Sequence, residues 1–155
     1  MAKGYACEKI GEYVREEYGE GFVLDFGGNL KCVGSKPGGD GWTSGIRNPN
    51  QFATNPYVHT FKIKNQAAVT SGSYERFYVV DGVRYHHLID KDTLFPQNTY
   101  VSVTIICSSS AMADALSTAF FNMEVSEISE IVSQIDDELS VVILFEDGTK
   151  QIIEK

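Results

Sequence analysis

The stretch YVSVTIICSSSAMADALSTAF, residues 100–120, decides most of the fold. Its first part, Tyr100 to Cys107, is rich in β-branched and other apolar side chains, which predicts a buried strand. Three serines follow, and we expect a helix from Ser110. The stretch therefore predicts a core strand that passes directly into a small, apolar helix.

One charged side chain, Asp114, lies among the small apolar residues of this expected helix. We expect it in the first turn, and Thr118, four positions later, places its hydroxyl on the same face. A lone carboxylate is costly to bury without a partner, and Mg²⁺ is a fitting partner because it prefers oxygen ligands. Alternatively, Asp114 only serves the helix N-terminus, where negative charge is favourable. The motif by itself leaves both interpretations open.

The composition is that of a globular protein with its own core. The 155 residues, 43% hydrophobic and 22% charged, predict one domain. The net charge of −8 argues against a general binder of nucleic acid or anionic membranes, because both require basic surface. No apolar run approaches the roughly 20 residues of a membrane span and no export signal is visible, so we expect a cytoplasmic location. Three widely spaced cysteines, Cys7, Cys32 and Cys107, are expected to be reduced core thiols.

Apolar periodicity and turn residues divide the chain into helices and strands. Helices are expected over 2–18 and 124–135, besides the one from Ser110. Strands are expected over 21–26, 29–34, 42–47, 58–64, 66–70, 76–80, 83–89, 100–107, 140–145 and 150–153. Asp-Gly pairs at 81–82 and 147–148 predict hairpin turns, and residues 71–73 a further turn. This order predicts an α+β fold in which helices pack on an antiparallel β-sheet.

Two further segments carry polar groups that can form a site. The turn expected at Ser71 and Gly72 can offer backbone N–H groups to phosphate, although small polar residues also make turns that bind nothing. In a strand through His86 and His87, neighbouring side chains face opposite ways. We therefore expect one histidine to point into a site and the other to solvent or to the structure. A neutral imidazole there can act as a general base, whereas the spacing of histidines and cysteines disfavours zinc.

Five motifs occur in one order along nearly the whole chain. They are AKGYA at 2–6, FGGN at 26–29, TSGSYE at 70–75, HLID at 87–90 and ADALSTA at 113–119. Together they resemble the ApbE family of flavin transferases. The resemblance implies an ApbE-like domain, related to the T-fold, over residues 1–155. It covers only about the second half of a typical member, which implies a truncated homologue, an isolated domain or one piece of a split protein.

The resemblance also implies a chemistry. Family members bind FAD and Mg²⁺ and pass FMN to a Ser or Thr hydroxyl of a target protein. Carried over by motif, the Mg²⁺ ligands are Asp114 and Thr118, with the Ala111 carbonyl as a weaker third. Flavin contacts fall at Lys3 and Leu88, with Ser71 and Gly72 as further candidates for the dinucleotide. His87 matches the histidine proposed to activate the acceptor hydroxyl.

This chain departs from the family pattern beside the histidine. Members usually have Pro after the aspartate of that motif and Gly three residues later, where this chain has Lys91 and Leu94. Losing both changes the preferred geometry of the loop next to His87. Two alternatives to a transferase with an acceptor flavoprotein as partner therefore stay open. One is a non-catalytic flavin-binding or assembly subunit, and the other is a pyrophosphatase that splits FAD into FMN and AMP.

The partial coverage of the family bears on partners and location. If part of the site is missing, we expect a homo-oligomer or a partner chain that supplies the N-terminal half. Family members are often exported or membrane-anchored, in contrast to the cytoplasmic location expected from the residues present.

Overall fold

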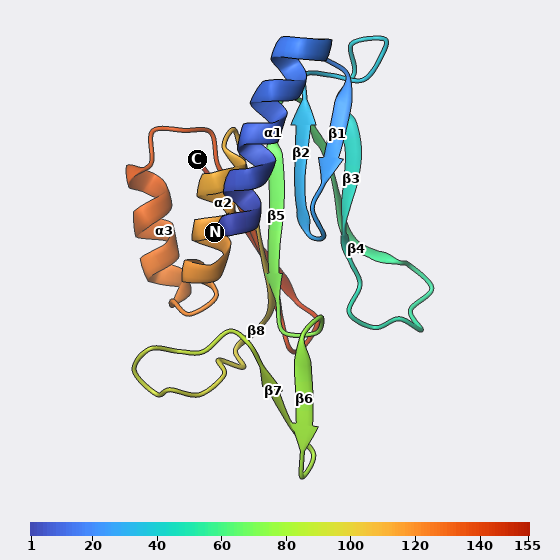
Figure 1. The fold of residues 1–155 in the computed structure, drawn as a ribbon. Coiled ribbons are helices and arrows are strands. Elements are labelled where there is room, and N and C mark those ends of the chain that lie inside the picture. The colour runs from blue at the N-terminus through green and yellow to red at the C-terminus, as the bar shows by residue number, and fades with distance from the viewer.

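Antiparallel pairing of six strands builds the main sheet of the structure, a computed structural model that describes residues 1–155. The order across the sheet is β1 (Phe22–Asp25), β2 (Asn29–Val33), β5 (Ala67–Gly72), β8 (Tyr100–Cys107), β9 (Ser140–Phe145) and β10 (Lys150–Glu154). Strand β8 is buried at every position, as its apolar sequence predicts. The expected α+β class with an antiparallel sheet is confirmed (Figure 1).

Three helices lie on one face of this sheet: α1 (Ala2–Tyr18), α2 (Ser110–Phe120) and α3 (Val125–Gln134) (Figure 1). Side chains point alternately to the two faces of each strand, so every second residue of β5, β8 and β9 meets the helices. Phe120 of α2 and Ile128 and Val132 of α3 are buried in the same core cluster as these residues. Burial of this apolar surface holds α2 against the centre of the sheet.

Two hairpins complete the structure. Strands β3 (Trp42–Arg47) and β4 (Tyr57–Ile63) pack on the opposite face, where Ile63 joins Cys32, Ala68 and Ile106 in a second core cluster. Strands β6 (Phe77–Val80) and β7 (Val83–His86) pair only with each other and project from the body (Figure 1). The turn between them lies at Asp81-Gly82, as predicted.

Two strand boundaries differ from the sequence-based prediction. Strand β5 continues through Ser71 and Gly72, where the sequence predicts a turn, because both residues pair with β8. Strand β7 ends at His86 instead of residue 89, because the Leu88 N–H donates to His86 Nδ1 at 3.2 Å and turns the chain away. Beyond it, Ile89 forms an isolated bridge with Pro96.

The three cysteines are free and buried, as expected. Burial raises the pKa of Cys32 and Cys107 to about 11, so both are protonated thiols at neutral pH. No helix in the structure combines the length and the hydropathy needed to cross a membrane.

Candidate active site

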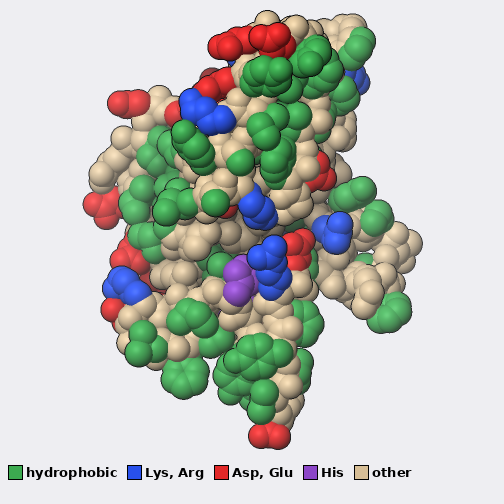
Figure 2. Space-filling view, viewed as in Figure 1, with side chains coloured by type: hydrophobic (Ala, Val, Ile, Leu, Met, Phe, Trp, Pro, Cys, Tyr) green, Lys and Arg blue, Asp and Glu red, His purple; other side chains and the backbone are tan.

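A cavity of about 410 Å³ opens where the N-terminal end of α1, one side of α2, the end of β5 and the segments after β5 and β7 meet. All predicted site residues except one line it: Lys3, Ser71, Gly72, His87, Leu88, Asp114 and Thr118. These residues come from four separate parts of the sequence. On this face, Figure 2 shows a histidine with basic and acidic side chains beside it, above the projecting hairpin.

Asp114 is only 7% exposed and lies at the fifth position of α2. The expectation that it sits in the first turn is wrong, because α2 already begins at Ser110. Other groups serve the helix N-terminus: Ser109 Oγ accepts from the Met112 N–H, and the Glu8 carboxylate accepts from the Ser110 N–H. The Asp114 carboxylate points into the cavity region instead of capping its own helix.

The Asp114 carboxylate is surrounded by positive charge and N–H groups. Its Oδ2 accepts from the Gly4 N–H at 2.8 Å and lies 2.9 Å from the Met1 amino group. Burial raises the pKa of this carboxyl, but the Met1 amino group, the Gly4 N–H and the Asn29 amide outweigh burial and leave the pKa below its ordinary value. The site therefore holds an ionised carboxylate and favours a positive group next to it.

Gly4 allows this approach of α1 to α2. A Cβ atom at Gly4 would lie 2.4 Å from Asp114 Cβ and 2.5 Å from the Ser110 carbonyl oxygen. Both distances are shorter than van der Waals contact, so only glycine brings the backbone of α1 within hydrogen-bonding distance of Asp114.

Thr118 lies one helical turn after Asp114, on the same side of α2, as the spacing predicts. Its Oγ1 donates to the Asp114 carbonyl oxygen at 3.3 Å and lies 3.3 Å from Ser71 Oγ. Ser71 Oγ is also 2.9 Å from Ser117 Oγ. No three His, Cys, Asp or Glu side chains gather into a metal-binding cluster. Beside the hydroxyl oxygens, the cavity wall offers the Asp114 carboxylate, a donor set that suits Mg²⁺, which usually retains water and phosphate oxygens as further ligands.

The two neighbouring histidines have different surroundings, although strand β7 ends at His86 and does not run through both. His86 is buried, and its Nε2 donates to the Gln97 carbonyl at 2.8 Å while its Nδ1 accepts from the Leu88 N–H. Its ring packs edge-on against Phe121. Desolvation lowers the pKa of His86, so this ring is neutral and structural.

His87 is exposed and lines the cavity. Its Nδ1 lies 3.4 Å from the Arg76 carbonyl oxygen. A carbonyl only accepts hydrogen bonds, so this contact requires the proton of a neutral ring to be on Nδ1. The lone pair of Nε2 is then free to take a proton from a group in the cavity.

The remaining predicted residues are placed differently. Lys3 Nζ donates to the Gly27 carbonyl at 2.8 Å, which ties α1 to the β1–β2 turn at the edge of the cavity. Leu88 is buried and belongs to both the cavity wall and the main core. Ala111 lies outside the cavity lining, and its N–H interacts with the Glu8 carboxylate.

Asn29, Glu75, Arg76 and Asn122 also line the cavity, although the sequence analysis assigns them no role. Two of them carry a signal in the sequence. Asn29 follows the Gly27-Gly28 turn, and Asn122 continues the four-residue spacing that joins Asp114 to Thr118. Its Nδ2 donates to the Thr118 carbonyl at 3.3 Å.

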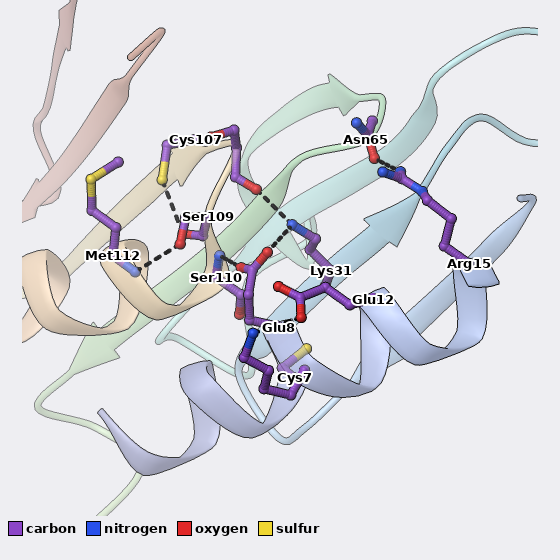
Figure 3. A network of polar contacts seen from close by, with 12 residues as sticks. Cys7, Glu8, Glu12, Arg15, Lys31, Asn65, Cys107, Ser109, Ser110 and Met112 are labelled. Carbon is purple, nitrogen blue, oxygen red and sulfur yellow. Dashed lines mark hydrogen bonds and ion pairs between the residues drawn. The ribbon is translucent and has the colours of Figure 1, made fainter. Parts of the chain in front are cut away.

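A partly buried ion pair joins α1 to β2, and through Ser110 to the start of α2 (Figure 3). Lys31 Nζ lies 3.0 Å from Glu8 Oε1 and donates to the Ser108 carbonyl at 2.6 Å. Burial raises the pKa of Glu8, but Lys31 and the N–H groups of Ser110 and Ala111 outweigh burial and lower it. One carboxylate therefore joins the start of α2 to a lysine of the sheet.

Sequence comparison relates the chain to known proteins. The ApbE family model matches residues 1–143. The FAD:protein FMN transferase of Treponema pallidum is 39% identical over an alignment of length 130, and the match covers 78% of this chain and 36% of that protein. The FAD:protein FMN transferase of Klebsiella pneumoniae is 32% identical over an alignment of length 138, and the match covers 88% of this chain and 42% of that protein.

Solved structures agree. The crystal structure of the ApbE protein of Thermotoga maritima matches 97% of this chain and 48% of its own, with a TM-score of 0.84 and 34% identity. The flavin transferase ApbE of Vibrio cholerae matches all of this chain and 48% of its own, with a TM-score of 0.72 and 25% identity. The chain thus spans less than half the length of these relatives.

Proposed function

The chain belongs to the ApbE family, and on that premise we propose that its cavity binds FAD with Mg²⁺ and serves the transfer of FMN to a Ser or Thr hydroxyl of a target protein. One observation carries the proposal. An ionised carboxylate, a hydroxyl, a lysine and a histidine with a free Nε2, from distant parts of the sequence, line one cavity. The relatives named above are FAD:protein FMN transferases, which supports a flavin substrate.

In this proposal, Asp114 and Thr118 hold the Mg²⁺ ion. The Asp114 carboxylate is ionised and lines the cavity on the same side of α2 as the Thr118 hydroxyl, so both offer the oxygen ligands that Mg²⁺ prefers. When bound, Mg²⁺ would neutralise charge that develops on the diphosphate in the transition state. The Ala111 carbonyl is a weaker third ligand, because Ala111 lies outside the cavity lining.

Lys3, Leu88, Ser71 and Gly72 are proposed to contact the flavin nucleotide. The Lys3 ammonium is held at the cavity edge by the Gly27 carbonyl, where it can face a phosphate. Leu88 supplies apolar wall, which suits a flavin ring. Ser71 and Gly72 stand at the end of β5, opposite Thr118.

His87 is proposed to be the general base. It takes the proton of the acceptor hydroxyl on Nε2, while Nδ1–H stays directed at the Arg76 carbonyl. The hydroxyl oxygen then bonds to the phosphorus of the FMN half, and the bond from that phosphorus to the AMP half breaks. FMN becomes a phosphoester of the target protein, and AMP leaves.

A labelling assay tests the proposal. The purified chain is incubated with FAD, Mg²⁺ and an acceptor protein that carries a flavinylation site, and flavin fluorescence is measured on denaturing gels. We expect a fluorescent acceptor with the unchanged chain. We expect a loss of at least about 10²-fold with His87→Asn, because general-base catalysis contributes about that much.

His59→Asn is the matched control, because His59 lies on β4 and does not line the cavity. It should label the acceptor at the normal rate. Release of FMN and AMP without labelled protein would show that the chain hydrolyses FAD instead of transferring FMN. A chain that neither binds FAD nor labels the acceptor would contradict the proposal.

A further inference from the structure

Asn29 has a buried side-chain amide whose hydrogen-bonding capacity is not used up. The residue is 1% exposed and lines the cavity; its amide acts on the Asp114 carboxylate, yet its Nδ2 makes no hydrogen bond of normal distance and angle. Buried polar groups in native structures nearly always have partners. The amide nitrogen carries two N–H donors, so even with one directed at Asp114 the cavity wall has a donor for an acceptor that arrives with the ligand.

The position of Asn29 limits what that acceptor can be. It is the first residue of β2, and it pairs with Val69 of β5 directly after the Gly27-Gly28 turn. Its cavity neighbours include Lys3 and Asp114, and Asp114 Oδ2 is already engaged by the Gly4 N–H and the Met1 amino group. The ligand group at this point must accept hydrogen bonds beside a site that attracts a cation.

We propose that Asn29 Nδ2 donates a hydrogen bond to a diphosphate oxygen of the bound nucleotide, next to the cation held by Asp114 and Thr118. The proposal rests on the proposed function, since it takes the ligand to be a dinucleotide with a metal ion. Diphosphate oxygens only accept hydrogen bonds, which matches a wall group that has a donor to spare. Asn29 is then a binding residue of the diphosphate.

A competing arrangement turns the amide over. Its oxygen would then face the cation and act as a metal ligand, because amide oxygens suit Mg²⁺ and the two ends of an asparagine side chain have the same shape. The two arrangements predict opposite effects of a change to aspartate, which keeps the shape and loses the donor.

The test measures two affinities for each protein: Mn²⁺ alone by electron paramagnetic resonance, and ADP in the presence of Mg²⁺ by calorimetry. For Asn29→Leu we expect ADP affinity to fall about 10-fold or more, with Mn²⁺ affinity unchanged, since hydrogen bonds to charged groups are strong. For Asn29→Asp we expect an even larger fall for ADP, while Mn²⁺ binds at least as tightly. A new carboxylate repels the diphosphate and attracts the cation. Gln151→Leu, at an exposed amide of β10 outside the cavity, should change neither affinity.

Three results would overturn the inference. Equal losses of Mn²⁺ and ADP affinity would indicate a structural lesion. The second result is that the leucine variant loses Mn²⁺ affinity and the aspartate variant regains both Mn²⁺ and ADP affinity. Asn29 would then be an oxygen ligand of the metal. Normal ADP affinity in both variants would leave the donor without a role.

Should the leucine variant fail to fold, the near-isosteric aspartate variant decides the question by itself. The wild-type titration separates the two proposals. If the wild type binds ADP or FAD with Mg²⁺ and the Asn29 variants do so equally well, only this inference fails. If the wild type shows no Mg²⁺-dependent binding of either nucleotide, the proposed function fails and this inference fails with it.

Discussion

Gly4 is the single residue on which the contact between α1 and Asp114 depends most. Gly4→Ala would place a methyl group 2.4 Å from Asp114 Cβ, so the helices must separate. We expect the free energy of unfolding to fall by about 1–3 kcal/mol, the usual cost of overpacking, and Mg²⁺ affinity to fall with it. Chemical denaturation and metal titration measure both.

Gly11→Ala is the matched control within the same helix. A methyl group there would lie 3.5 Å from Lys31 Cγ, which is ordinary contact. Alanine is the better helix former, so this change should be neutral or stabilising by up to about 1 kcal/mol. Equal destabilisation by both changes would show that Gly4 has no special role at Asp114.

Leu94 occupies the position where the ApbE family usually has glycine. Its φ is 61°, in the left-handed region, so the leucine keeps a backbone conformation that favours glycine. Leu94→Gly should raise the free energy of unfolding by up to about 1 kcal/mol. The relief of roughly 1–2 kcal/mol of backbone strain in the native state exceeds the free-energy cost of the extra conformational freedom that glycine gives the unfolded chain. Thermal unfolding measures the change. Lys91→Gly, in the same loop, is the control and should lower stability. A loss of stability in both variants would contradict this account.

His86 predicts a pH dependence of stability. Its native pKa lies below the ordinary value of about 6.5, so below that pH the unfolded chain binds more protons than the native one. Stability should therefore fall as the pH drops through 6.5, by at most about 1.4 kcal/mol per pH unit from this residue. Urea unfolding between pH 7.5 and 5.5 should show a shallower slope for His86→Gln.

His59 needs a separate measurement in the same pH range, because burial and Lys150 also lower its pKa. His59→Gln gives the contribution of His59 to the pH dependence of stability, and this contribution is subtracted from that of the wild type. A slope in His86→Gln identical to that of the wild type would mean that His86 is not held neutral by its surroundings.

Helix α2 shows what can be predicted at the scale of one element. The strand-to-helix boundary near Ser110 and the shared face of Asp114 and Thr118 follow from spacing alone. The groups that accept from the first N–H groups of α2 cannot be predicted in this way, because Glu8 is 102 residues away from Ser110 in sequence. Local periodicity cannot predict a cap that only the packing of α1 supplies.

The Lys31–Glu8 pair predicts a large effect of one substitution. Lys31→Met leaves the Glu8 carboxylate, with side-chain exposure of 20%, beside a buried neutral residue. We expect a loss of about 3 kcal/mol in the free energy of unfolding, less if water reaches the carboxylate. Denaturation of Lys31→Met and of Lys31→Met with Glu8→Gln measures it; the double variant should recover part of the loss.

The control is the Lys9–Glu12 pair on the outer side of α1, where both side chains are about half exposed (53% and 49%). Lys9→Met should cause no measurable change, because exposed ion pairs contribute little. If Lys31→Met is as mild as Lys9→Met, the Lys31–Glu8 pair does not hold α1 and α2 together.

Strand ends were harder to predict than strand centres. Strand β5 reaches Gly72 because β8 offers it pairing partners, and β7 stops at His86 because the His86 side chain accepts from the Leu88 N–H. Both effects come from contacts outside the local pattern. They matter for the site, since Ser71, Gly72 and His87 all lie at these ends.

At the scale of the molecule, the sheet brings the motifs together. The order β1-β2-β5-β8-β9-β10 places β2 and β5 side by side, and α1 and α2 lie on the same face (Figure 1). The Lys3, Asn29, Ser71 and Asp114 segments thereby meet in one cavity. The sequence motifs predicted the family, which the comparisons confirm, but the meeting of these residues required the strand order.

The claim that Asp114 and Thr118 hold a divalent ion for a flavin dinucleotide is tested most directly by calorimetric titration of FAD. The titration is done with Mg²⁺ and with a chelator, on the wild type, on the isosteric Asp114→Asn variant and on Asp92→Asn, an exposed control. We predict that Mg²⁺ tightens FAD binding at least about 10-fold in the wild type and in Asp92→Asn, and that Asp114→Asn loses this gain. A folded Asp114→Asn variant that keeps the full Mg²⁺-dependent gain would contradict the account.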